Sequence, residues 1–134
     1  MAGPSVKTLM TPFPYSVDVT ATLAVALTMM NEHGMRHLPV TAEGSVVGVL
    51  SKRELAVATA VCGQDLTVGE ICTREPYMVE HSTTAHEVAA TMAERQIGSA
   101  IVLHHGKLAG IVTTTDICRE YAALHRAEPP DQTA

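Results

Sequence analysis

An internal repeat is the feature that most constrains how this chain can fold. Residues 6–55 align on residues 68–117 without a gap, at the separation of Gly48 from Gly110, and eleven of the fifty aligned positions are identical. A solenoid needs at least three repeats, and this chain holds two. We therefore expect one duplicated unit whose halves, copy one and copy two, bury their apolar faces on each other.

Each copy predicts the same order of elements. A short turn and an extended Pro-Tyr-x-Val segment come first. Thr22 and Thr84 can each cap the helix that follows, whose apolar residues recur at i, i+3, i+4 and i+7. Gly34 predicts a left-handed cap at the end of the first of these helices. Two strands joined by a glycine turn and a second helix complete each copy, over residues 36–41, 45–50 and 52–61, and over residues 99–103, 107–113 and 114–125.

The composition predicts an aliphatic core and self-association. Apolar residues make up 46% of the 134 residues and aromatic residues only 3%, so the core must consist of Val, Ile, Leu, Ala and Met. This length is enough to bury a core without disulfides or metal. Charged residues, at 17%, fall below the usual quarter. A chain of this kind often covers part of its surface with a partner, and we expect a homodimer.

Charge and hydropathy argue against several classes of protein. The net charge is −5 and no basic stripe is visible, which disfavours nucleic-acid binding. The apolar stretch 23–30 is too short to span a bilayer, and residues 1–13 lack the order of a signal peptide. Three scattered cysteines form no CxxC pair, so neither a disulfide framework nor a structural zinc site is expected. We expect a cytoplasmic protein without membrane contact.

The ordered motifs resemble a CBS domain, the cystathionine-β-synthase type. Copy one reads Gly-x-x-His-Leu-Pro-Val and then Gly-Val-Leu-Ser-x-x-Glu-Leu, and copy two reads Ile-Gly-Ser-Ala-Ile-Val and then Gly-Ile-Val-Thr-Thr-Thr-Asp-Ile. The resemblance implies an α/β (α+β) fold of two tandem β-α-β-β-α units, 5–62 and 66–125, related by pseudo-two-fold symmetry, as in a stand-alone Bateman module. Residues 126–134 are expected to form a frayed polar tail.

The resemblance also implies a function. Such modules bind AMP, ADP, ATP or S-adenosylmethionine in two clefts between the units, need no obligatory cofactor, and regulate another protein. We therefore expect a ligand-sensing module that signals to a separate partner of unknown identity. The alternative is a module for dimerisation or protein interaction whose clefts stay empty.

The copy-two motif supplies the candidate ribose and phosphate site. Asp116 begins the last helix, where its carboxylate can accept both ribose hydroxyls, while Thr113 and Thr115 offer hydroxyls to a phosphate beside the helix N-terminus. Ser99 is assigned to the same cleft. Capping of the helix by Thr113 and Asp116 is the alternative. The resemblance gives this cleft a wall for the base that consists of Ser5, Leu9, Met10 and Met35, and plain core packing is the alternative for these residues.

The other cleft departs from the family pattern. Glu54 stands where the family has Asp, and its longer arm would misplace the oxygens for a ribose. This cleft is richer in cations, because Arg36, His37 and Arg53 belong to copy one, and the first two match positions that often contact phosphate in the family. A solvated helix face is the alternative for Arg53, and an interface histidine is the alternative for His37. The remaining predicted residues of this cleft are Ser51, Thr67, Ile71, Cys72 and Ile97.

Neither catalysis nor metal binding is expected. No Ser-His-Asp order and no glycine-rich phosphate loop occurs, so we expect no enzyme. His81 and His86 are spaced poorly for one ion on a helix. His104 and His105 are neighbours on a strand and should point to opposite faces unless the turn bends them.

Overall fold

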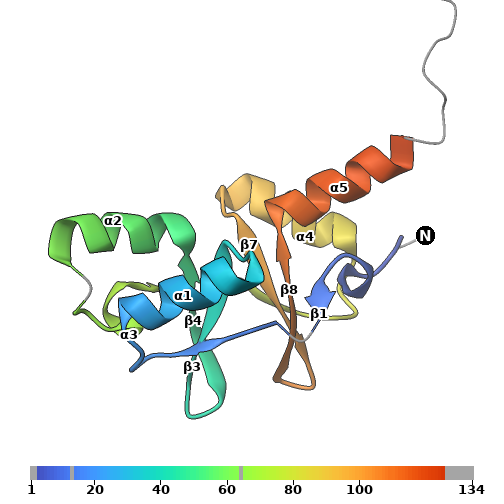
Figure 1. The fold of residues 1–134 in the computed structure, drawn as a ribbon. Coiled ribbons are helices and arrows are strands. Elements are labelled where there is room, and N and C mark those ends of the chain that lie inside the picture. The colour runs from blue at the N-terminus through green and yellow to red at the C-terminus, as the bar shows by residue number, and fades with distance from the viewer. Residues whose placement is uncertain (1–2, 13, 64, 126–134) are drawn as a thin grey trace, which may run out of the picture.

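The computed structural model of the chain describes residues 3–12, 14–63 and 65–125, so the predicted tail at 126–134 lies outside the described residues. Two halves of like architecture lie beside each other (Figure 1). Copy one contains a 3-10 helix (Val6–Thr8), β1 (Thr11–Pro12), β2 (Val17–Asp18), α1 (Leu23–His33), β3 (His37–Ala42), β4 (Ser45–Ser51) and α2 (Lys52–Cys62). Copy two contains α3 (Val68–Ile71), β5 (Thr73–Arg74), β6 (Met78–Glu80), α4 (Ala85–Arg95), β7 (Ser99–His104), β8 (Lys107–Thr113) and α5 (Thr114–His125). The predicted duplicated α/β fold is confirmed.

The two copies exchange a short edge strand. The sheet orders are β2-β3-β4-β5 and β1-β8-β7-β6, so β1 of copy one completes the sheet of copy two, and β5 of copy two completes the sheet of copy one. Figure 1 shows β1, drawn in blue, beside the orange β8. Both exchanged strands run antiparallel to their new neighbours, with Pro12 opposite Gly110 and Arg74 opposite Gly48. The exchange ties the halves together through backbone hydrogen bonds.

The repeated glycines at 48 and 110 permit this exchange. A Cβ atom on Gly48 would lie 2.7 Å from the Thr73 carbonyl oxygen, and one on Gly110 would lie 2.9 Å from the Thr11 carbonyl oxygen. Real Cβ contacts are longer than either distance. Each exchanged strand passes so close to its glycine that no side chain fits there, which explains why both copies have glycine at this position.

Each of the two hydrophobic cores also contains a residue from the other copy. One core gathers Leu23, Met30, Leu38, Leu50 and Leu55 of copy one, together with Val68 from the leading turn of copy two. The other gathers buried residues of copy two with Val6 from the leading turn of copy one. Met92, which belongs to the second core, is 3% exposed. The other residues named here are exposed by 1% or less: Val6, Leu23, Met30, Leu38, Leu50, Leu55, Val68, Val88, Ala100, Val102 and Val112.

The first helix of each copy begins and ends at equivalent residues. Thr22 and Thr84 cap α1 and α4 as predicted, accepting hydrogen bonds from Val25 N at 3.3 Å and Glu87 N at 3.1 Å. Gly34 ends α1 in the left-handed conformation with φ of 62°, and Gln96 ends α4 in the same conformation with φ of 55°. Neither of these helices, nor any other in the described ranges, combines the length and apolarity needed to cross a bilayer.

Candidate functional site

Two cavities lie at the seam between the copies. The large cavity has a volume of about 930 Å³ and the small cavity of about 470 Å³. Each is lined by residues of both copies, and Arg36, His37 and Gly98 line both. Cavities of this size accommodate ligands as large as a nucleotide.

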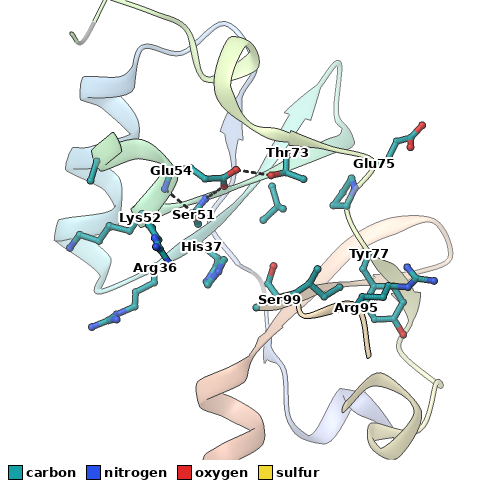
Figure 2. Close-up of a pocket in the computed structure, with 16 residues that line it drawn as sticks. Arg36, His37, Ser51, Lys52, Glu54, Thr73, Glu75, Tyr77, Arg95 and Ser99 are labelled. Atoms are coloured by element: carbon teal, nitrogen blue, oxygen red, sulfur yellow. Dashed lines mark hydrogen bonds between the residues drawn. The ribbon is translucent and has the colours of Figure 1, made fainter. Parts of the chain in front are cut away.

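The large cavity is positively charged although the chain is acidic. Four cationic side chains line it, from Arg36, Lys52, Arg53 and Arg95, against two carboxylates, from Glu54 and Glu75. Figure 2 shows Arg36 and Lys52 on one side and Arg95 of copy two on the other. A cavity with this balance in a chain of net charge −5 favours an anionic ligand. The other residues that line it are His37, Val49, Ser51, Ala56, Thr73, Pro76, Tyr77, Ile97, Gly98 and Ser99.

The Glu54 carboxylate is occupied by hydrogen bonds within the protein. Its Oε1 accepts from Ser51 N at 2.8 Å in a capping box at the start of α2, while Ser51 Oγ accepts from Glu54 N at 3.0 Å. Its Oε2 accepts from the Thr73 hydroxyl of copy two at 2.6 Å (Figure 2). The longer side chain that departs from the family pattern thus joins the two copies at the cavity wall.

Asp116 lines the small cavity and also takes part in capping α5. Its side chain is 11% exposed, and Oδ2 accepts from Thr113 N at 2.8 Å and from Thr113 Oγ1 at 3.1 Å. Its Oδ1 forms an ion pair with Arg119 at 3.2 Å. The two interpretations of this residue, a ligand contact and a helix cap, are therefore compatible. Arg119 also lines the cavity and was not singled out by the sequence.

Some predicted residues line the cavities and others do not. Met35, Thr113, Thr115 and Asp116 line the small cavity, whereas Ser99 lines the large one. Six of the predicted residues of the other cleft line the large cavity: Arg36, His37, Ser51, Arg53, Glu54 and Ile97.

Six predicted wall residues from the leading turns are not among the residues that line the two cavities. Leu9 and Met10 pack against one core, and Ile71 and Cys72 against the other, while Ser5 and Thr67 form isolated bridges to Thr84 and Thr22. The reason is the strand exchange, which turns these residues inward. The walls start at the exchanged strands instead, with Thr11 in the small cavity and the aligned Thr73 in the large one.

Aligned ring contacts stand near the two cavities. In copy two, the Arg95 guanidinium lies 5.2 Å from the ring centre of Tyr77, and both residues line the large cavity. In copy one, Tyr15 stacks on His33 with ring centres 3.7 Å apart, and His33 lines the small cavity. Tyr15 aligns with Tyr77, and His33 aligns with Arg95. The repeated Pro-Tyr was the signal in the sequence that could have identified these pairs.

His37 lies in a restrictive position at the seam. Its Nδ1 is buried and has no hydrogen-bond partner. A Cβ atom on Gly98 would lie 3.3 Å from its Nε2, so copy two approaches the ring closely. Burial lowers the pKa of His37, the charge of Arg36 acts in the same direction, and Glu54 opposes the shift.

Three other histidines gather at the end of the copy-two sheet. The ring of His104 lies 4.0 Å from that of His81 and 4.0 Å from that of His105, because the turn bends the chain at His105, where φ is 52°. Within the described residues, no group of three or more His, Cys, Asp or Glu side chains is arranged to hold a metal ion.

Together these features define a class of protein, a tandem α/β repeat with two ligand-sized cavities at its seam. The chain belongs to the CBS domain family, whose model matches residues 6–60 and 68–123. Among curated proteins, it is 28% identical over 115 residues to the CBS domain-containing protein YhcV of Bacillus subtilis, covering 84% of this chain and 82% of that protein.

Several of the solved structures similar to this chain hold a bound ligand. The pair of protein MJ0100, in complex with 5′-methylthioadenosine and S-adenosyl-L-methionine, is 26% identical with a TM-score of 0.83, covering 90% of this chain and 97% of that one. CBSX2 in complex with AMP is 27% identical with a TM-score of 0.76, covering 94% and 100%. The CBS domain of a bacterial CNNM/CorC family Mg²⁺ transporter in complex with ATP is 28% identical with a TM-score of 0.77, covering 87% and 86%.

Proposed function

We propose that this protein is a cytoplasmic regulatory module that binds an adenosine-type nucleotide at the seam between its copies and signals to a separate protein. The observation that carries the proposal is the positively charged large cavity in an acidic chain. The bound AMP, ATP and S-adenosylmethionine of the similar structures support it. No catalytic step is part of this function.

Each part of a nucleotide has a proposed partner in the small cavity. Asp116 accepts the ribose hydroxyls, which requires its ion pair with the exposed Arg119 to open or to be shared. Thr115 and the α5 N-terminus donate to a phosphate, and Thr113 does so once its hydroxyl turns away from Asp116. The base lies among Met35, Ile111 and the His33 ring, since all three line this cavity.

The large cavity suits a ligand with more negative charge. Arg36, Arg53 and Arg95 supply fixed positive charge there. Both oxygens of Glu54 are held by hydrogen bonds from Ser51 and Thr73, whereas Oδ1 of Asp116 is held by the exposed Arg119. We therefore assign di- and triphosphates to the large cavity, with Arg36 as the main phosphate contact.

Thermal melting of the full chain tests nucleotide binding. The ligands are AMP, ATP, S-adenosylmethionine and adenosine, with GMP as the control for the base. A ligand at 100 times its Kd stabilises the folded state by about 2.7 kcal/mol, which a melt detects readily. Equal melting temperatures with and without all of the adenosine ligands would refute the proposal.

Exposed apolar residues favour a second function, assembly into a homodimer. Val57 and Val61 on α2 are 58% and 78% exposed, and Leu124 on α5 is 68% exposed. A surface of this kind is commonly covered by a partner, and a second copy of the chain is the occupant we propose. Native mass spectrometry of the purified protein measures both the oligomer and any nucleotide that purifies with it, and a monomeric mass across concentrations would exclude the homodimer.

A further inference from the structure

His37 is placed to sense what occupies both cavities. Among the described residues, three line both cavities, namely Arg36, His37 and Gly98. Of these, only His37 has a side chain that can gain a proton when a ligand binds, because a guanidinium stays charged and glycine has no side chain. Figure 2 shows His37 between the side chains of copy one and Ser99 of copy two.

The seam around His37 tolerates the neutral imidazole better than the charged one. In the neutral ring, the buried Nδ1 can be an unpaired lone pair, which costs less than an unpaired N–H on a charged ring. Protonation places a hydrogen on both ring nitrogens, and no acceptor within the described residues meets Nδ1. An unsatisfied buried donor is costly, and so is an unbalanced charge.

The charged groups around His37 do not balance the charge of a protonated ring. The charge of Glu54 on α2 favours the protonated ring, but burial outweighs it, and its oxygens already accept hydrogen bonds from Ser51 and Thr73. Asp116 on α5 is paired with Arg119. The cations in the two walls oppose a further positive charge. The remaining titratable or charged residues that line the cavities are His33 on α1, Arg36 on the approach to β3, Lys52 and Arg53 on α2, Glu75 and Tyr77 before β6, and Arg95 on α4.

We propose that His37 takes up a proton when a phosphate-bearing ligand binds in either cavity, so that binding in both cavities depends on pH through one imidazole. The inference rests on the proposed nucleotide binding and adds its regulation. A bound phosphate gives the protonated His37 ring the negative counter-charge that the protein itself does not supply, and the charged ring in turn attracts the phosphate.

The shared position of His37 sets quantitative limits. Uptake of one proton strengthens binding by at most about tenfold for each unit of decrease in pH. One imidazole accepts one proton, so a chain that binds two nucleotides still takes up no more than one at this residue. Adenosine, which lacks a phosphate, should bind without this uptake.

Isothermal titration calorimetry of the nucleotide-free full chain measures this proton uptake. AMP is titrated at several values between pH 5.5 and 7.5, each in two buffers of different ionisation enthalpy, because the difference in heat gives the protons exchanged. The variants are His37→Gln and, as the matched control, His86→Gln, since His86 is exposed on α4 and lines neither cavity. The phosphate of free AMP also titrates near pH 6, and the protons bound by the free ligand are the same for all three chains.

Wild type and His86→Gln should take up more protons than His37→Gln, by up to one per chain, and adenosine should show no such difference. Equal uptake of protons in wild type and His37→Gln, with AMP bound, would overturn this inference and leave the proposed function standing. Absence of binding by AMP, ATP, S-adenosylmethionine and adenosine would overturn both. If His37→Gln does not fold, the pKa of His37 is followed by NMR in wild type, where AMP should raise it and an unchanged pKa refutes the inference.

Discussion

Replacing Gly48 with alanine should destabilise the protein at the point where the copies exchange strands. The added methyl group would lie 2.7 Å from the Thr73 carbonyl oxygen and 2.8 Å from the Cys72 thiol. The carbonyl belongs to β5, which pairs with β4 through Gly48 and Val49, so it cannot move without loss of this pairing. Overpacking of this kind costs about 1–3 kcal/mol.

The expected change in melting temperature follows from the length of the chain. Unfolding entropy is about 2.1 cal/mol/K per residue, so for 134 residues each kcal/mol lowers the Tm by about 3–4 °C. Differential scanning calorimetry should therefore show a decrease of about 4–10 °C for Gly48→Ala. Ser45→Ala, at an exposed position of the same strand, should change the Tm little.

A double variant separates the two contacts. Cys72→Ala removes the thiol but leaves the Thr73 carbonyl, so Gly48→Ala with Cys72→Ala should recover only part of the lost stability. Complete recovery would show that the thiol alone causes the clash. An unchanged Tm in the single variant Gly48→Ala would refute the role of Gly48 in admitting the exchanged strand.

Four further predictions concern the cavities and the helix ends. Asp116→Ala should weaken AMP binding at least tenfold in calorimetry whereas Glu54→Ala should weaken it less, and equal losses would contradict the assignment of the ribose to Asp116. Arg36→Ala should reduce the affinity for ATP more than that for adenosine, and an unchanged ratio of the two affinities would remove Arg36 from phosphate binding. Gln96→Gly should raise the free energy of unfolding by about 0.5–1 kcal/mol, because Gln96 has φ of 55° and glycine adopts this conformation without strain; a loss of stability in urea titrations would contradict this. The pKa of His37 is lower in the folded state than in the unfolded state, where it is about 6.5, so the unfolded state binds more protons as the pH falls below that value, and ligand-free protein should lose stability there. Urea titrations at pH 7.5 and 5.5 should show a smaller loss for His37→Gln than for wild type, and equal losses would assign the acid sensitivity to other groups.

The sequence was sufficient to predict the architecture of each copy. The helical spacing of apolar residues, the capping residues Thr22 and Thr84, and the turn glycines are local signals, and the repeat doubled each of them. Gln96 shows the limit of such signals. It occupies the left-handed position that Gly34 occupies in copy one, although its local preference does not favour that conformation.

The cavities were predicted only in part because their walls depend on pairing across the chain. The positions of Asp116 and Glu54 followed from short motifs. The wall residues Thr11 and Thr73 depended on the exchanged strands, and strands of two residues carry no periodicity that a sequence could reveal. The position of His37 against Gly98 likewise depends on how the copies meet, which alignment of one copy on the other does not determine.

The exchange of leading strands also bears on how the protein is made. Thr11 and Pro12 leave the ribosome early, yet their partners are Ile111 and Gly110, near the far end of the chain. Copy two's sheet therefore lacks its outer strand, and its core lacks Val6, until the N-terminal segment returns to it. Pairing over so large a sequence separation slows folding. During synthesis, the leading segment of copy one should stay open to proteases and to stray pairing longer than the rest of that copy.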